Sequence, residues 1–272
     1  LSDIAALRFY SQKAGTVNVF DSLNIAGGGI LVAQNIGNYK KRILGGSITS
    51  SGYPDTLADN TDLMIHNYGT GSLTIGATIA DSGAGKVNLV LGGTGTTILT
   101  AANTNTGEIY LNNGVLSISS ESNLGAINGS IVDLTRVSNG GNGNSGSTAA
   151  YSANTNASIV FTTANAPTTA AVGTFNSSTT VVTATSLTSG GAGYTTGVWA
   201  NLNDPNRTTE NPAGVWAILD SGNLHFNGGT LAVTQDVTLN GARTLFLGAN
   251  GASLDVAAGK TLTINGYITS EI

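Results

Sequence analysis

The sequence of 272 residues contains no cysteine and few charged residues. Without cysteine, the chain can form neither disulfides nor thiolate metal sites. Charged residues make up 9% of the chain, compared with about 25% in typical globular proteins. The 10 basic residues are outnumbered by 15 acidic ones, which gives a net charge of −5. This balance argues against a nucleic-acid partner, because phosphate binding requires an excess of cations.

Long apolar runs and helical patterns are also scarce. No segment approaches the run of about 20 apolar residues that a membrane-spanning helix requires. Outside the first few residues, no sustained i, i+3, i+4, i+7 apolar pattern is present. The chain opens on Leu1 without a basic and apolar leader. We therefore expect either that a leader has been removed or that the chain is part of a longer protein.

Apolar residues that alternate with small polar ones fill most of the sequence. The apolar fraction is 40%, which is enough for a long core and argues against disorder. Segments such as 73–75, 109–111 and 115–118 alternate with a period of two, as short strands do. Glycine, at 38 residues, is roughly twice as frequent as usual and separates these segments. The pattern predicts an all-β fold with many tight turns.

The spacing of the predicted strands indicates a repeating architecture. Near the C-terminus, the strand starts at Leu224, Thr244 and Leu262 are separated by about 20 residues, which is typical of one turn of a solenoid. We therefore predict a right-handed parallel β-helix, in which each turn closes its core by stacking on the next. A β-sandwich or barrel, which also has short, evenly spaced strands, is the alternative.

Composition divides the predicted solenoid into three parts. Residues 1–134 and 224–272 carry the regular strand rhythm. Residues 135–223 are rich in Ser, Thr, Ala and Gly and depart from it. We predict that this middle segment is a lateral excursion, either a small β subdomain or extended loops.

One stretch resembles a known bacterial repeat. The residues 95–107, followed by 109–118 and Leu124-Gly125, are similar to the autotransporter-associated β-strand repeat, which we place at 93–125. The sequence departs from the family pattern at Asn105, where the repeat usually has Tyr, and at residues 108–109. The resemblance implies a passenger-type β-helix that is exported to the surface of a bacterium. The repeat carries no catalytic residues to transfer.

Acidic residues provide the one candidate cation site. Carboxylates at short spacing are typical Ca²⁺ ligands, and the densest cluster contains Asp55, Asp59 and Asp62. The alternative is a polar loop after Pro54, because the glycine and closing glutamate of an EF-hand loop are absent. No other metal or cofactor is expected.

Catalytic groups are harder to assemble from this sequence. His66 and His225 lie singly in predicted strands, and the remaining aspartates are scattered near turns. A β-helix polysaccharide hydrolase or lyase would need paired acids that face one groove, so we predict a protein that is not an enzyme and keep the enzyme as an alternative. The basic cluster 40–42 is interpreted as a solvated corner, with contact to an acidic polymer or a neighbouring subunit as the alternative.

Aromatic residues of the excursion offer a candidate ligand surface. Tyr194, Trp199 and Trp216 lie close together in sequence and could stack on sugars, as in a glycan- or host-binding adhesin. The alternative is that they form a small core of their own.

The predicted end turns carry apolar patterns without a charged cap, and unpaired strand edges accept further strands. We therefore predict a structural surface protein that stacks head to tail on itself, or that continues into further repeats of the same chain. The predicted assembly residues are Leu1, Leu7, Phe9, Leu262, Ile264, Tyr267 and Ile268.

Overall fold

The computed structural model describes residues 2–51, 60–83, 85–134, 154–177, 182–202 and 214–271. These residues form strands and two short 3-10 helices, η1 (Gln34–Ile36) and η2 (Glu121–Leu124). None of the described helices is long and apolar enough to cross a membrane. The chain divides into two compact units: unit 1 contains Leu1–Ala126 and Ser221–Ile272, and unit 2 contains Ile127–Asp220. The prediction of an all-β protein is confirmed.

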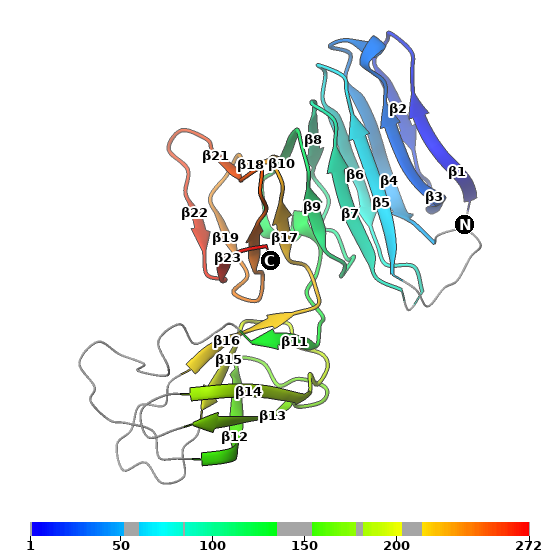
Figure 1. Cartoon of the computed structure of the whole chain (residues 1–272). Helices are drawn as coiled ribbons and strands as arrows, with labels where there is room; N and C mark the ends of the chain where they lie inside the picture. Colours follow the sequence, from blue (N-terminus) through cyan, green and yellow to red (C-terminus); the bar gives the residue numbers. More distant parts are fainter. Residues whose placement is uncertain are drawn as a thin grey trace. The chain divides into compact units, whose positions relative to one another are not determined.

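Unit 1 is built on a sheet of 15 strands whose pairs are all parallel (Figure 1). The sheet contains two long ladders. Ladder A consists of β1 (Ser2–Phe9), β3 (Ser22–Val32), β5 (Thr61–Asn67), β7 (Val87–Gly92), β9 (Ile109–Leu111), β17 (Leu224–Phe226), β20 (Leu245–Leu247) and β23 (Ile268–Ser270). Ladder B consists of β2 (Gly15–Asn18), β4 (Lys41–Thr49), β6 (Leu73–Ile79), β8 (Thr96–Leu99), β10 (Val115–Ile118), β18 (Thr230–Val233) and β21 (Ser253–Val256).

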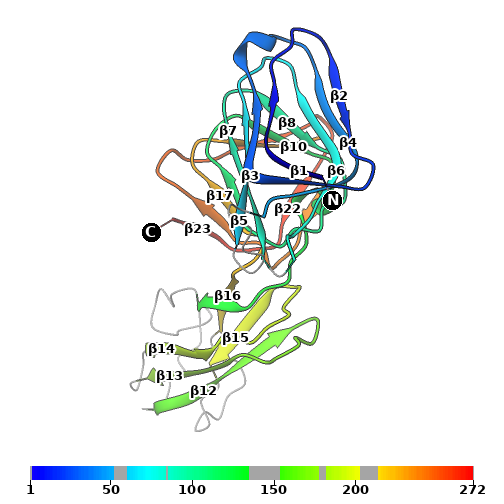
Figure 2. The same cartoon turned by 90° about the vertical axis from the view of Figure 1, so that its right-hand side faces the viewer.

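A third ladder completes the path of the chain. Ladder C contains the parallel pair β19 (Val237–Leu239) and β22 (Leu262–Ile264). From β17 to β23 the chain visits ladders A, B and C in turn and then returns to A, and we call one such passage a circuit (Figure 2). Each strand pairs with the equivalent strand of the next circuit.

The predicted equivalence of Leu224, Thr244 and Leu262 is wrong at its third member. Leu224 pairs with Leu245, and Leu245 pairs with Ile268 in ladder A. Leu262 instead pairs with Val237 in ladder C. The turns between strands differ in length from one circuit to the next, so a constant spacing of about 20 residues drifts out of register.

The core of unit 1 follows from the alternation of side chains along each strand. In β6 the burial alternates without a break, so that Leu73, Ile75, Ala77 and Ile79 are buried and the residues between them are half-buried. Pairing then places like side chains above one another. One continuous row of buried aliphatic residues in ladder A contains Leu63, Leu89, Ile109, Leu224 and Leu245.

Glycine is required where β3 turns from one ladder into the next. Residues 22–24 pair with β4, and residues 29–32 pair with β5. Between them, Gly28 has a φ of 68°, which only glycine adopts readily. A Cβ at this position would lie 2.2 Å from the carbonyl oxygen of Asp62. The turn therefore depends on the missing side chain.

Unit 2 is an antiparallel sheet of six strands. In sheet order the strands are β11 (Ile131–Leu134), β16 (Gly214–Leu219), β15 (Val198–Leu202), β12 (Asn154–Thr163), β13 (Val172–Ser177) and β14 (Val182–Ser189). Ile159, Val198 and Leu219 are among its buried apolar residues. The unit overlaps the segment 135–223, which composition set apart from the regular strands.

We predict that the core row of β6 dominates the stability of unit 1. Ile75→Ala should lower the free energy of unfolding by about 2–5 kcal/mol, because Ile75 is fully buried and leaves a cavity. Thr74→Ala, at the next position, should change it by less than about 0.5 kcal/mol, because this side chain faces outward. Urea unfolding of both variants tests the alternation, and equal losses would contradict it.

Candidate functional site

Three aromatic rings stack along the outward face of ladder A. Tyr110, His225 and Phe246 are paired neighbours on β9, β17 and β20. The ring centroids of Tyr110 and His225 lie 4.6 Å apart, and those of His225 and Phe246 also lie 4.6 Å apart. Interplanar angles of 23° and 10° make both contacts stacked. The parallel register therefore holds the imidazole between two rings.

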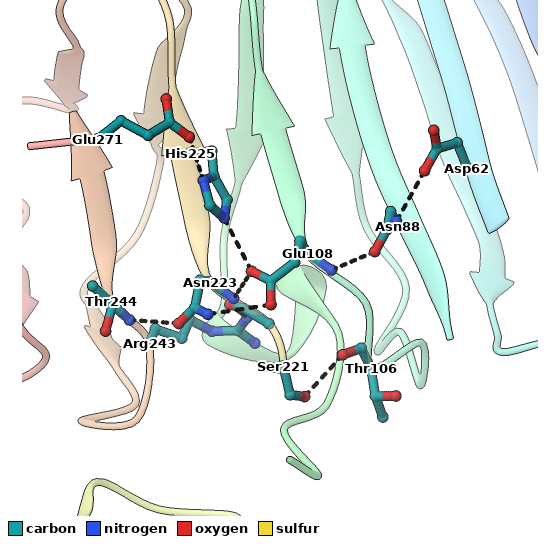
Figure 3. A network of polar contacts seen from close by, with 11 residues as sticks. Asp62, Asn88, Thr106, Glu108, Ser221, Asn223, His225, Arg243, Thr244 and Glu271 are labelled. Atoms are coloured by element: carbon teal, nitrogen blue, oxygen red, sulfur yellow. Dashed lines mark hydrogen bonds and ion pairs between the residues drawn. The ribbon is translucent and has the colours of Figure 1, made fainter. Parts of the chain in front are cut away.

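Two carboxylates contact the edges of this imidazole (Figure 3). His225 Nδ1 lies 2.7 Å from Glu271 Oε1, and His225 Nε2 lies 3.2 Å from Glu108 Oε2. Glu108 directly precedes β9, and Glu271 directly follows β23. A carboxylate accepts hydrogen bonds, and only the protonated imidazole donates from both nitrogens. The geometry therefore suits an imidazolium that joins two glutamates from distant parts of the sequence.

The surroundings of His225 shift its titration. Burial of the ring lowers the pKa of His225, but the hydrogen bonds to Glu108 and Glu271 and the charges of these residues raise it by more. The pKa of His225 therefore lies above its ordinary value of 6.5. The pKa of the Tyr110 phenol is also raised, first by burial and then by the nearby charge of Glu108.

Glu108 links His225 to a longer row of polar contacts (Figure 3). Its Oε2 accepts a hydrogen bond from the backbone N–H of Asn223 at 3.0 Å, and its Oε1 accepts one from Asn223 Nδ2 at 3.2 Å. The backbone N–H of Glu108 donates to Asn88 Oδ1 at 2.9 Å, and Asn88 Nδ2 donates to Asp62 Oδ1 at 2.9 Å. We call the residues from Asp62 through Asn88, Glu108 and His225 to Glu271 the polar row. The row crosses ladder A from β5 to the end of β23.

Arg243 forms a second, buried polar cluster next to Asn223. Its side chain is fully buried, and its Nε donates to Glu121 Oε1 at 2.7 Å. The two terminal nitrogens donate to the backbone carbonyls of Gly222 and Gly125. Burial lowers the pKa of Arg243, and the charge of Glu121 opposes that shift. Gly125 and Gly222 lie in the chain segments that leave and re-enter unit 1, so Arg243 fastens both of them.

The polar row has the geometry of a structural fastening. Neighbouring rings cover both faces of the His225 imidazole, and both of its nitrogens contact carboxylates. Neither nitrogen can accept a substrate proton unless one of these contacts breaks. Across the described ranges, no three His, Asp or Glu side chains come together in a way that could hold a metal ion.

Of the three aspartates in the candidate Ca²⁺ site, the structure describes only Asp62. Asp62 lies on β5, where its carboxylate accepts the hydrogen bond from Asn88. Asp55 and Asp59 lie outside the described residues. The Ca²⁺ hypothesis therefore stays a prediction for these two residues, and Asp62 has a partner within unit 1.

The three aromatic candidates of unit 2 have different surroundings. The side chain of Tyr194 is buried, and its hydroxyl accepts a hydrogen bond from the backbone N–H of Ala171 at 2.8 Å. Trp199 on β15 is 42% exposed. Its backbone pairs with that of Trp216 on β16, whose side chain lies outside the described residues. Tyr194 thus packs inside unit 2, whereas the side chain of Trp199 is exposed.

The predicted assembly residues lie on the outermost strands of unit 1. At one end, Leu7 is half-buried and Phe9 is buried on β1. At the other end, Ile268 is 48% exposed on β23, and Tyr267 is 37% exposed just before it. Leu262 and Ile264 on β22 are half-buried. Leu1 lies outside the described residues.

The prediction that residues 40–42 form a solvated corner is wrong for Lys41. Lys40 and Arg42 are exposed, but the side chain of Lys41 is buried. Its ammonium donates to the backbone carbonyls of Ser11, at 2.6 Å, and of Lys13. A lysine tolerates burial when backbone acceptors surround its charge.

Several residues of these clusters were missed from the sequence. No catalytic or binding motif in the sequence contains Glu108, Glu121, Arg243 or Glu271, and the strand pattern predicts only that His225 is an isolated polar residue. His225 and Glu108 are 117 positions apart in the chain, and only the pairing of β9 with β17 joins them. The one sequence signal was Glu108 itself, which departs from the repeat pattern.

Comparison with known proteins gives one relative. The chain is 30% identical over 127 residues to a protein described as "Adhesin BmaC autotransporter" from Brucella suis biovar 1 (strain 1330). The match covers 46% of this chain and 4% of the relative. No protein-family model matches the chain, and no solved structure matches it. The similarity is therefore to a small part of a much longer autotransporter adhesin.

We predict that His225 makes the stability of unit 1 depend on pH. Because the pKa of His225 is raised in the folded state, its contribution is full below the unfolded value of 6.5 and is lost as the pH rises through the folded value. The melting temperature of the wild type should therefore fall towards that of His225→Gln as the pH rises from below 6.5 to above it. Thermal melts of both proteins measure this difference, and a gap that is constant over this range would contradict the prediction.

We also predict that Arg243 is needed for the fold of unit 1. Arg243→Ala should cost roughly 3 kcal/mol, because it leaves buried carbonyls without donors and breaks the ion pair with Glu121. Arg243→Lys should recover only part of this loss, since a single ammonium cannot replace the forked guanidinium. Lys260→Ala is the control, and urea unfolding is the measurement. A full recovery with lysine would show that charge alone matters.

Proposed function

We propose that this chain is a non-enzymatic structural segment of an exported bacterial surface protein, and that it extends by stacking end on end with further copies of itself. The relative that it matches is described as an autotransporter adhesin, and such a description fits a protein outside the cell. The observation that carries the proposal is that, within the part of the chain that the structure describes, β21 and β23 pair on one side only and expose apolar side chains.

Unit 1 in this proposal is a right-handed parallel β-helix. The repeated path through ladders A, B and C supports a solenoid, since each circuit pairs only with its neighbours. A right-handed path is favoured because connections between parallel strands are right-handed in nearly all known sheets.

The last circuit exposes side chains that other circuits bury. All four residues of β21 are exposed, including Leu254 at 46% and Val256 at 36%. Their partners on β18, Leu231 and Val233, are buried. An added circuit would cover the exposed pair and would bond with the free backbone edge of β21.

The first circuit offers a matching surface. Leu7 and Phe9 on ladder A and Val17 on ladder B point towards the core, and they pack against its buried residues. Ladders A and B thus carry apolar inward residues at one end, on β1 and β2, and at the other end, on β23 and β21. A contact between unlike ends does not close on itself, so it would produce an open filament.

The charges at the two ends are also matched in register. Arg8 begins an outward row of ladder A that continues through Leu31 and His66. At the far end the same row reaches Glu271. The backbone N–H of Glu271 donates to the carbonyl of Leu247, and the backbone N–H of Gly248 donates to the carbonyl of Phe226 in the same way. If β1 of a second copy were added to β23, Arg8 would lie about 4.8 Å along the row from Glu271. The attraction of these charges supports the head-to-tail arrangement.

The expected outcome is that the purified chain forms larger species as its concentration rises, and that Leu254→Glu prevents this. Leu254 is already partly exposed in the single chain, so the variant should keep its fold and fail only at the junction. Arg8→Glu should weaken assembly most at low salt, because it places like charges together. Analytical ultracentrifugation and electron microscopy measure both effects.

Val172→Glu is the matched control, because Val172 is 54% exposed on unit 2 and takes no part in the proposed junction. The control should assemble as the wild type does. The proposal would be wrong if the wild type stayed a monomer at every concentration, or if Leu254→Glu assembled as well as the control.

A further inference from the structure

Exposed cations line a hollow of unit 1 and a second hollow that adjoins it. Lys13, Lys40 and Arg42 are exposed side chains from the turn before β2 and from the start of β4. The hollow has a volume of about 490 Å³ and is lined by residues 14–16, 38–40 and 42. A second hollow of about 500 Å³, which Lys13 lines, shares residues 14–16 with the first. We call these residues together the basic hollow.

The cations of the basic hollow are not neutralised by the chain. Within the described part of the chain, no carboxylate lies within ion-pair distance of Lys13, Lys40 or Arg42. The chain has only 10 basic residues in total and a net charge of −5. Like charges that lie close together repel one another. The electrostatic energy of this group of cations therefore becomes favourable only when an anion binds to it.

Aromatic side chains border the same region. Tyr39 lines the first hollow and is 44% exposed, and Tyr10 lines the second and is 64% exposed. The guanidinium of Arg8 lies 5.5 Å from the centre of the Tyr10 ring, which is a cation–π distance. Exposed tyrosines supply flat apolar faces with a polar tip, a surface on which a sugar ring can pack.

Hydrogen bonds from side chains to backbone carbonyls fix the walls of the basic hollow in place. The ammonium of Lys41 holds the carbonyls of Ser11 and Lys13 from inside the turn. On the outer side, Gln12 Nε2 donates to the carbonyl of Asn35 at 3.0 Å, and Asn35 Nδ2 donates to the carbonyl of Tyr10 at 3.3 Å. A surface that is ordered before binding loses less entropy when a ligand arrives.

We propose that the basic hollow binds an anionic polysaccharide, with Lys13, Lys40 and Arg42 facing its carboxylate or sulfate groups and Tyr39 packing on a sugar ring. Carboxylated and sulfated chains share this chemistry, and the cations accept either one. The inference goes beyond the proposed structural role and does not depend on it, because binding by a single chain requires no stacking.

The test measures binding of the whole 272-residue chain to heparin, to polygalacturonate, to neutral dextran and to double-stranded DNA. The wild type should bind at least one of the two anionic polymers, more weakly as salt rises, and should not bind dextran. The double variant Lys40→Gln/Arg42→Gln should raise the Kd for the anionic polymer that binds roughly tenfold or more. Tyr39→Ala should weaken binding without changing its salt dependence.

The matched control is Lys86→Gln/Lys260→Gln, which removes the same charge elsewhere on unit 1 and should leave the Kd within about twofold of the wild type. Circular dichroism of each variant checks that the fold is kept. Binding to heparin but not to polygalacturonate would show that the hollow requires sulfate, because polygalacturonate carries carboxylates only. Equal weakening by the two double variants, binding to neither polymer, or tighter binding to double-stranded DNA would overturn the proposal.

Discussion

The architecture of unit 1 depends on the parallel pairing of each circuit with the next. A single circuit cannot bury its own inward side chains, and it leaves every backbone N–H and C=O of its strands without a partner. Stacking solves both problems at once, because the row from Leu63 through Leu89 and Ile109 to Leu245 becomes one core while the ladders pair the backbone. Among the described residues, β21 and β23 pair on one side only, and Leu254 and Ile268 on these strands are exposed.

This constraint also explains how unit 2 is accommodated in the chain. Ladder A continues from β9 to β17 as though unit 2 were absent from the chain, with Ile109 paired with Leu224 and Leu111 with Phe226. Since the entropy of closing a loop grows slowly with loop length, a long insertion costs little if its two ends are held close together. Arg243 meets that condition through the carbonyls of Gly125 and Gly222. A residue of a later circuit thus fastens the point of insertion.

The difference between what the sequence predicts and what it leaves open has a physical basis. Alternation is a local property, so the buried and outward positions of β6 could be predicted from residues 73–79 alone. Register is not local: Leu262 lies in ladder C because of the turns that precede it, and no strand pattern reports their length. The contacts of His225 were hidden for the same reason, since Glu108 and Glu271 reach it only through pairing across circuits. Lys41 could not be assigned to the interior, because its acceptors are backbone carbonyls.

Because charged residues are scarce in this chain, the contacts of each one are informative. Neutral side chains can cover the outward face of a ladder, as the threonines of β6 do, and charged residues are not needed for solubility at every position. Several charged residues of unit 1 therefore have identifiable partners: Arg243 binds Glu121, and His225 joins two glutamates. Against this background, Lys40 and Arg42 are neighbouring exposed cations that have no carboxylate within ion-pair distance among the described residues. We base the proposed anionic partner on this contrast.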